Sequence, residues 1–369
     1  MNSDVLVIGG GLHGLSAALQ TARRGASVQL VERHFVGRHA SGATAAGVRT
    51  LGRNPAELPL SLEAAADWHD MAGLVGDDCG FVACGQLQLA EDDAAMAGIA
   101  QRIARLRAAG FGHEQRIDAA QVRDLLPGVA GHCLGGARVA GDGSADPHRT
   151  IRAFRAAAIA AGVRIAEDCQ LTGLTRAAGH WRAETTRGRF AAARLVNAAG
   201  AWADRVAALA GDPLRHAIRT SMMVVTERVA PRIGPVVGSF GRRLSLKQTA
   251  QGTLLIGGGA QGRLAADGQS ATVDIEALAG AVQAAIRVFP ELHGVRMVRT
   301  RVGMEAMMPD HIPVIGLSRQ VEGLVHVFGF SGHGFQLVPA VGRVIADLVC
   351  DGGTGRDIGA FDPGRARAP

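Results

Sequence analysis

The stretch Asp4-Val5-Leu6-Val7-Ile8-Gly9-Gly10-Gly11-Leu12-His13-Gly14 decides the fold of this 369-residue chain. Its apolar first half predicts a short, buried strand, and its glycines have the G-x-G-x-x-G spacing. An Ala- and Leu-rich helix is expected over about 12–24, with Gly25 ending it. A second strand is expected over 27–31, and Glu32 closes that strand. Strand, glycines, helix, strand and acid in this order predict a site for an adenine dinucleotide.

Each glycine of this motif has a separate physical role. Gly9 permits a tight turn, Gly11 lets the backbone approach a pyrophosphate, and Gly14 lets the helix pack closely on the strand. The helix N-terminus offers free N–H groups to phosphates. Glu32 follows close to the offset of about 20 residues at which an acid binds a ribose hydroxyl. A tight strand-to-helix turn without a ligand is the alternative interpretation.

Length and composition describe a globular protein of two domains. The chain is 47% hydrophobic and 20% charged, and it has neither an apolar run long enough for a membrane helix nor a secretory signal, so a cytoplasmic location is expected. The net charge is +6, but every basic residue except Lys247 is a scattered Arg and Tyr is absent, which argues against nucleic-acid binding. The cysteines form no C-x-x-C pair, so reduced thiols are expected and no metal site is predicted.

The rest of the chain has the pattern of a doubly wound α/β sheet that a second domain interrupts. A Gly-, Ala- and Ser-rich segment over 33–53 is suited to lie against a flat ligand or a phosphate. Residues 213–300 are β-rich, and residues 351–369 are expected to form a loose tail. Further helices are expected over about 60–74, 92–109, 148–161 and 273–289, a hairpin over 171–186, and strands over about 84–90, 163–165, 194–197, 221–226, 244–249 and 253–259.

Five segments, in one order along the chain, together resemble a known family. They are residues 7–11, 41–49, 196–202, 309–316 and 329–335, the last of which is Gly-Phe-Ser-Gly-His-Gly-Phe. Over nearly its whole length the chain resembles the FAD-dependent amino-acid and amine oxidoreductases, which include D-amino-acid oxidase, glycine oxidase, sarcosine oxidase and the catalytic β subunits of opine and hydroxyproline dehydrogenases. The expected fold class is therefore α/β, with a Rossmann-like FAD-binding domain and a discontinuous, β-rich (α+β) substrate domain. The expected FAD-binding segments are 1–80, 135–212 and 301–350, and the expected substrate-binding segments are 81–134 and 213–300.

The resemblance implies FAD as the cofactor. The Cys that tethers flavin in monomeric sarcosine oxidases is replaced by Gly303, so non-covalent FAD is expected. Segment 329–335 is followed by a helix with Pro339 in its first turn, whose N-terminus is expected to face the flavin pyrimidine edge and stabilise reduced flavin. A loop selected only for tightness is the alternative for 332–334. The implied cofactor-binding residues are Gly9, Gly11, Leu12, His13, Gly14, Glu32, Arg33, Ser41, Gly42, Ala46, Gly47, Ala199, Gly200, Trp202, Gly303, Gly332, His333, Gly334, Phe335 and Gln336.

The substrate side is also inferred from the resemblance. Arg49 stands where sarcosine-oxidising relatives bind the substrate carboxylate, and Gln336 replaces a second basic residue there. Glu305 stands where glycine-oxidase-like relatives have a carboxylate-binding Arg, which favours a substrate with an extra cation or a secondary ammonium, such as a guanidinium-bearing opine. The alternatives are a solvated surface Arg49 and a salt bridge from Glu305 to Arg299 or Arg301.

Two further positions concern electron transfer. Leu255 replaces the Lys that promotes oxygen reaction in monomeric sarcosine oxidase, which argues for a dehydrogenase that passes electrons to a quinone or a partner subunit. Lys247 is expected on a neighbouring strand, from which it could reach the same site. His148 lies near the position where heterotetrameric sarcosine oxidases bind a second flavin, FMN, although a His at a helix start is the simpler interpretation.

The predicted function is oxidation of the C–N bond of an amino acid or a secondary amino acid such as an opine, hydroxyproline or sarcosine. Hydride passes from the substrate to the flavin, and the imine product hydrolyses to an oxo acid and an amine. Arg49, Glu305, Gln336 and His333 are the expected catalytic residues. The alternatives are a glycine-oxidase-like or hydrogen-cyanide-synthase-like subunit that acts on a small amine, and a flavin-binding subunit without turnover.

Overall fold

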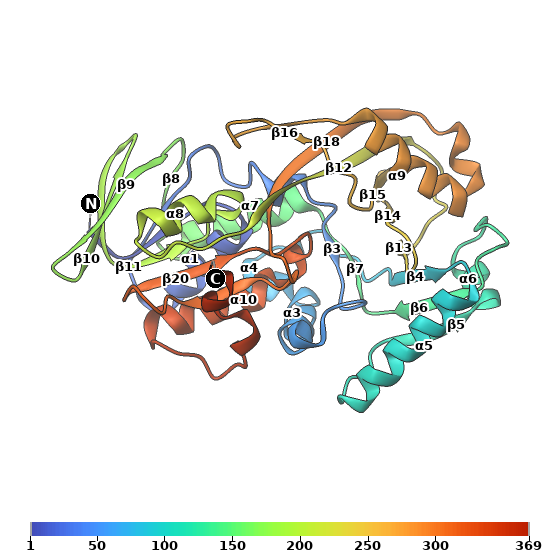
Figure 1. Ribbon diagram of the computed structural model, residues 1–369, viewed down its shortest axis with the longest axis horizontal. Coiled ribbons are helices and arrows are strands. Elements are labelled where there is room, and N and C mark those ends of the chain that lie inside the picture. The colour runs from blue at the N-terminus through green and yellow to red at the C-terminus, as the bar shows by residue number, and fades with distance from the viewer. Residues whose placement is uncertain (1, 368–369) are drawn as a thin grey trace.

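Two large β-sheets organise the chain, and the computed structural model describes residues 2–367 of it (Figure 1). The first sheet has the strand order β19-β20-β11-β1-β2-β8, and a hairpin of β9 and β10 extends it from β11. β1 pairs in parallel with β2 and β11, and β11 pairs in parallel with β20, which confirms the α/β class. The strands are β1 (Asn2–Ile8), β2 (Val28–Val31), β8 (Arg164–Ala166), β9 (Leu171–Ala177), β10 (His180–Thr185), β11 (Gly188–Asn197), β19 (Val314–Leu317) and β20 (Leu324–Phe328).

Helices cover both faces of the first sheet. Successive side chains of a strand point to opposite faces, so Val5 and Val7 pack with α1, α7 and α10, whereas Leu6 and Ile8 pack with α8 and the hairpin. The carboxyl end of β1, where the glycine motif begins, therefore lies between two helical layers. These helices are α1 (Leu12–Arg23), α7 (Pro147–Ala160), α8 (Ala203–Leu209) and α10 (Gly334–Cys350).

The second sheet has the strand order β18-β12-β15-β14-β13-β4-β6-β5. One of its faces packs on α9 and α6, and residues of the other face line a cavity between the two sheets. Its strands are β4 (Gln86–Ala90), β5 (Gln115–Asp118), β6 (Gly135–Val139), β12 (Ala217–Arg228), β13 (Val236–Ser239), β14 (Ser245–Gln248), β15 (Thr253–Gly257) and β18 (Met297–Met307). The helices beside it are α5 (Asp93–Ala108), α6 (Ala119–Leu125) and α9 (Ile275–Val288).

Two strands pair differently from the expected division of the chain. β6 pairs with β4, and β18 pairs along its length with β12, so residues 135–139 and 301–307 belong to the second sheet. The expectation had assigned both segments to the FAD-binding domain. The rest of the proposed division into domains stays a prediction.

Two local predictions about helices are wrong. The helix expected over 60–74 is two helices, α3 (Leu58–Trp68) and α4 (Met71–Val75), because the Asp70 side chain caps a new helix by accepting the Gly73 N–H. Pro339 lies inside α10, since that helix begins at Gly334 rather than closer to the proline.

The expected loose tail is packed over the residues that the structure describes. Phe361 is fully buried in the core that contains α10, and Ala366 is also buried. The Arg367 guanidinium is 2.7 Å from the Asp212 carboxylate. A composition rich in Gly, Pro and Arg suggested a loose tail, but buried apolar side chains hold it, and its arginines form ion pairs such as that of Arg356 with Glu63. Residues 368–369 of that prediction lie outside the described part.

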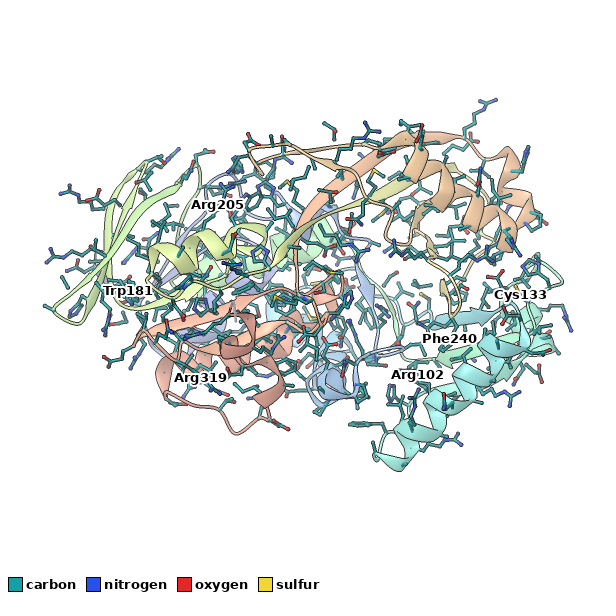
Figure 2. All side chains as sticks on the ribbon, in the orientation of Figure 1. Arg102, Cys133, Trp181, Arg205, Phe240 and Arg319 are labelled. Carbon is teal, nitrogen blue, oxygen red and sulfur yellow. The ribbon has the colours of Figure 1, made fainter. Side chains whose placement is uncertain are left out.

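Shorter elements join these layers. None of the helices within residues 2–367 is long and apolar enough to cross a membrane. Trp181 on the hairpin and Cys133 beside the second sheet lie at opposite ends of the molecule (Figure 2). The remaining elements are α2 (Ala40–Ala43), β3 (Gly47–Val48), β7 (Gly143–Ser144), β16 (Arg263–Leu264), β17 (Ala271–Thr272), η1 (Pro55–Glu57), η2 (Gly200–Trp202), η3 (Pro290–Gly294), η4 (Gly359–Phe361) and η5 (Pro363–Ala366).

Candidate active site

A cavity of about 670 Å³ lies between the two sheets and brings most of the predicted site residues together. Four predicted residues do not lie on its wall: Gly14, Gly42, Ala46 and Gln336. The predicted residues that line it are Gly9, Gly11, Leu12, His13, Glu32, Arg33, Ser41, Gly47, Arg49, Ala199, Gly200, Trp202, Gly303, Glu305, Gly332, His333, Gly334 and Phe335.

Close packing explains the glycines of the first motif. A Cβ at Gly9 would lie 2.4 Å from the Ala198 carbonyl oxygen, and a Cβ at Gly14 would lie 2.0 Å from the Gly9 carbonyl oxygen. Gly14 thus brings α1 against β1 without touching the cavity. Gly9 also has φ +110°, which disfavours a side chain.

Two helix N-termini open onto the cavity. Gly11 and His333 are the N-cap residues of α1 and α10, and neither gives its helix a side-chain cap. Ser41 Oγ accepts a hydrogen bond of 3.0 Å from the Leu12 N–H. Helix N-termini carry partial positive charge, so this arrangement favours negative groups at two places in one cavity.

His13 lies between the two helix starts. Its ring stacks on Phe330, with the centroids 3.6 Å apart and the planes at 1°. Burial lowers the pKa of His13 to about 3, so the ring is neutral at ordinary pH. His13 therefore contributes a flat, uncharged wall.

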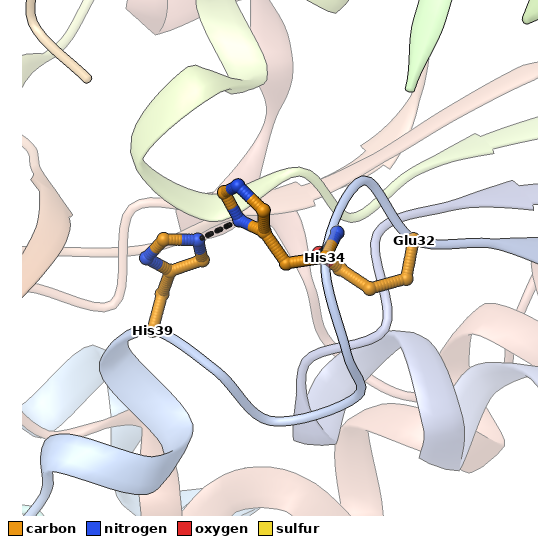
Figure 3. A group of neighbouring side chains, drawn as sticks. All are labelled: Glu32, His34 and His39. Atoms are coloured by element: carbon orange, nitrogen blue, oxygen red, sulfur yellow. Dashed lines mark hydrogen bonds between the residues drawn. The ribbon is translucent and has the colours of Figure 1, made fainter. Parts of the chain in front are cut away.

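Glu32 and two histidines form a compact group at one end of the cavity (Figure 3). The Glu32 carboxylate accepts the N–H of Gly10 at 2.7 Å and the N–H of His34 at 3.0 Å. His34 Nδ1 lies 2.9 Å from His39 Nε2, and burial, followed by the charge of Arg33, lowers the pKa of His39 to about 3. The atoms that would bind a metal already contact one another or the backbone, so we assign no metal here.

The loop between β16 and β17 lies at this end of the cavity. This loop extends toward the first sheet, near the label β16 at the top of Figure 1. Trp202 Nε1 donates to the Gly268 carbonyl at 3.0 Å, and an Arg33 nitrogen donates to Gln269 Oε1 at 2.6 Å. The Arg33 guanidinium lies 3.5 Å from the centre of a Trp202 ring, and two of its buried nitrogens have no partner within the described chain. These unpaired nitrogens suit a polar ligand.

Two buried carboxylates hold the loop that carries Arg49. Asp142 accepts the N–H groups of Thr50 and Leu51 at 2.8–2.9 Å. Glu114 accepts the Gly52 N–H at 2.9 Å and pairs with Arg102 at 2.7 Å. The loop over 49–53 is therefore fixed by two carboxylates from distant segments, one between β6 and β7 and one directly before β5.

This loop presents two arginines to the cavity. Arg49 is half-buried on the wall, which excludes the solvated surface alternative, and burial lowers its pKa. Arg53, which the sequence interpretation missed, donates to the carbonyls of Arg49 at 3.0 Å and His333 at 2.9 Å. Burial, followed by the charge of Arg49, lowers the pKa of Arg53 to about 9. Arg53 Nη1 has no partner in the described structure, so it can donate to an anion in the cavity.

Glu305 faces the cavity from β18. Its Oε1 accepts a 2.6 Å hydrogen bond from Ser221 Oγ, and its residue is directly opposite Arg219 on β12. Burial raises the pKa of Glu305. Within the described residues Glu305 makes no ion pair with Arg299 or Arg301, so the salt-bridge alternative is wrong.

A family model described as FAD dependent oxidoreductase (DAO) matches residues 4–348. The chain belongs to this DAO family. It is therefore an FAD-dependent oxidoreductase, as the resemblance implied. The two open helix N-termini and the unpaired nitrogens of Arg33 and Arg53 fit a bound dinucleotide and an anionic substrate.

Known relatives of this DAO-family enzyme match nearly its whole length. Glycine oxidase of Geobacillus kaustophilus is 26% identical over 375 residues, covering 97% of this chain and 96% of that protein. Mitochondrial dimethylglycine dehydrogenase of Homo sapiens is 24% identical over 389 residues, covering 98% of this chain and 44% of that protein. The crystal structure of L-proline dehydrogenase from P. horikoshii matches with a TM-score of 0.91 at 26% identity, covering 99% of this chain and 97% of that one.

Gln336 of the DAO-family enzyme lies away from the cavity. Its Nε2 donates to the Ser61 carbonyl at 2.6 Å, and its Oε1 accepts from Ser61 Oγ at 3.1 Å and from Arg53 at 3.4 Å. The expectation that Gln336 contacts cofactor or substrate is therefore wrong, because this position of α10 points toward α3. Its contact with Arg53 makes it a supporting residue.

Gly42 and Ala46 also support the wall from behind. A Cβ at Gly42 would lie 2.5 Å from the Gly37 carbonyl oxygen, and Ala46 is buried with φ 54°. Neither residue reaches the cavity, so direct contact with the cofactor is not supported for either. Both allow the segment to fold tightly behind Ser41.

His148 is exposed at the start of α7, after the N-cap residue Asp146. It does not line the cavity. This position agrees with a plain helix-start His, and a second flavin there stays a prediction.

Proposed function

We propose that this DAO-family enzyme oxidises the C–N bond of an amino acid whose nitrogen carries a substituent, with an opine as the favoured class. The observation that carries this proposal is the pairing of opposite charges in one cavity. Arg49 and Arg53 enter from the loop over 49–53, and Glu305 enters from β18. An α-carboxylate and a cationic group of one substrate would satisfy both sets.

One set of cavity residues would hold the cofactor, and another would bind the substrate. The N-terminus of α1 with Ser41 would hold the pyrophosphate, and Glu32 would hold a ribose hydroxyl. When bound, FAD supplies the acceptor for the substrate hydride. The N-terminus of α10 would lie at the flavin pyrimidine edge, where its partial positive charge favours negative charge.

The substrate contacts require little acid–base chemistry from the protein. Arg49 would bind the carboxylate and fix the Cα–H in position, because charged hydrogen bonds are directional and strong. Glu305 would bind the ammonium or a distal cation, and Ser221 fixes its carboxylate. Positioning within a cavity closed by both domains would then account for most of the rate enhancement.

The electron acceptor is proposed to be a quinone or a partner subunit, in a dehydrogenase located in the cytoplasm. Support comes from Leu255, an apolar residue on the cavity wall at the position that carries Lys in monomeric sarcosine oxidase. A glycine-oxidase-like enzyme is the second candidate, and Glu305 in place of a carboxylate-binding Arg argues against it.

Anaerobic spectroscopy tests the proposal. Purified enzyme would be mixed with sarcosine, D- and L-proline, cis-hydroxyproline, glycine, octopine and nopaline, and bleaching of the flavin recorded. We expect the fastest bleaching with an N-substituted amino acid that carries a second charged group. Fastest bleaching by glycine would support the second candidate, and absence of bleaching by every compound would support a subunit without turnover.

A further inference from the structure

His333 and Glu57 form a buried pair at the start of α10 that the sequence interpretation did not include. His333 Nε2 is 2.8 Å from Glu57 Oε1, and His333 Nδ1 is 3.2 Å from the Ser331 carbonyl oxygen. The side chains are 12% and 3% exposed. When Glu57 is ionised, each ring nitrogen of His333 therefore faces an oxygen that can accept a hydrogen bond but cannot donate one.

This geometry provides a place for one additional proton. A neutral imidazole has a single N–H, so it can satisfy only one of the two oxygen acceptors at a time. A second proton would complete both hydrogen bonds and form an ion pair with Glu57. The site is therefore built for His333 to accept a proton without moving.

Opposing charges balance this site. Burial and then Arg53 lower the pKa of His333, whereas the hydrogen bond and charge of Glu57 raise it. Burial alone would raise the pKa of Glu57, but the hydrogen bond with His333 holds that pKa below its ordinary value. Arg49 adds a smaller lowering effect on His333.

Two further titratable groups face this part of α10 from other elements. A Cβ at Gly332 would lie 3.7 Å from both carboxylate oxygens of Glu305 on β18. A Cβ at Gly334 would lie 2.9 Å from Nε2 of His13 on α1, and burial keeps that ring neutral. Of the two carboxylates near this end of α10, Glu57 is the one that is hydrogen-bonded to the His333 ring.

We propose that Glu57 is a positioning residue that lets His333 take up one proton from water when negative charge develops in the cavity. A flavin bound with its pyrimidine edge at the N-terminal end of α10 would bring such a charge there when a hydride reduces it. The inference rests on the proposed position of the flavin there. Its consequence is that flavin reduction binds one proton more than hydride transfer alone requires.

The midpoint potential of the bound FAD measured against pH, from 6 to 9, tests this coupling without any substrate. One proton coupled to a two-electron couple changes the potential by about 30 mV per pH unit. In the pH range in which the wild-type pair takes up its proton, we expect the slope of midpoint potential against pH to be smaller by about 30 mV per pH unit in Glu57→Gln than in the wild type. Glu57→Asp, which keeps the charge, should retain the wild-type slope.

A matched control is Glu63→Gln, because Glu63 lies on the neighbouring helix α3 and pairs with Arg343 and Arg356 away from the cavity. We expect the wild-type slope in this variant. A wild-type slope in Glu57→Gln would overturn the inference. If Glu57→Gln loses FAD, His333→Gln decides the question: a shallow slope supports the inference and a wild-type slope overturns it.

Failure of the inference and failure of the proposed function are distinguishable in these experiments. Substrate bleaching with an unchanged slope in Glu57→Gln would reject only the proton uptake. A reduced slope without bleaching by any amino acid would reject only the proposed substrate class.

Discussion

Lys247 and Leu255 are direct cross-strand partners on β14 and β15, and both side chains reach the cavity. Lys247 Nζ donates to the Ala145 carbonyl at 3.3 Å, and burial lowers its pKa to about 8. The apolar Leu255 therefore has a partly charged amine in the next strand. This geometry makes the contribution of Lys247 to oxygen reaction measurable.

We expect Lys247→Met to slow the reoxidation of reduced enzyme by oxygen by about tenfold, since a cation favours superoxide formation. The pKa of about 8 means that the charge is present below this pH and is lost above it. The wild-type reoxidation rate should therefore fall as the pH rises through about 8. Stopped-flow spectroscopy of dithionite-reduced enzyme mixed with oxygen measures the reoxidation rate. Lys247→Arg should retain the rate and lose the pH dependence; equal rates in all three proteins would exclude a role for Lys247.

Arg49→Ala should raise KM by about 10- to 100-fold, because charged hydrogen bonds contribute about 1.5–3 kcal/mol. FAD content should remain normal, as the proposed role is with the substrate carboxylate. Steady-state kinetics and the flavin absorbance of the purified protein measure the two effects. Arg152→Ala, on the solvent side of α7, is a suitable control. Unchanged kinetics in Arg49→Ala would remove it from the substrate site.

Glu305→Gln should lower kcat/KM for a substrate with a second cation by about tenfold or more, while a substrate without that cation should be affected less. Burial raises the pKa of Glu305, so as the pH falls this side chain loses its negative charge at a higher pH than an ordinary Glu does. The preference of the wild type for the cationic substrate should therefore decrease toward acid pH. Competition between paired substrates across pH measures it. An equal loss for both substrates in Glu305→Gln would contradict cation recognition.

Phe361→Ala should lower the free energy of unfolding by about 3–5 kcal/mol, the usual cost of removing a fully buried Phe. Denaturant unfolding followed by circular dichroism would measure the change. Asp357→Ala, in the same segment but on the surface, should have little effect. A loss below about 1 kcal/mol for Phe361→Ala would mean that the segment over 351–367 contributes little to stability.

The sequence by itself determined the nucleotide-binding half of this protein. The order of β1, the glycine motif, α1, β2 and Glu32 depends on local spacing, and spacing is visible without a structure. The family motifs added FAD and the enzyme class for the same reason. Residues such as Gly9 and Ser41 therefore line the cavity as expected.

Only the tertiary structure decided which buried polar groups meet. Gln336 follows the family motif directly, yet the rotation of α10 directs it to Ser61 and away from the cavity. Arg53 and Glu57 look like ordinary charged residues in the sequence, but both contact His333, more than 270 positions away, at the start of α10. Phe361 likewise is buried because it packs in the core that contains α10, which its local sequence does not indicate. Such pairings depend on distant segments packing together, and a local pattern of residues does not record them.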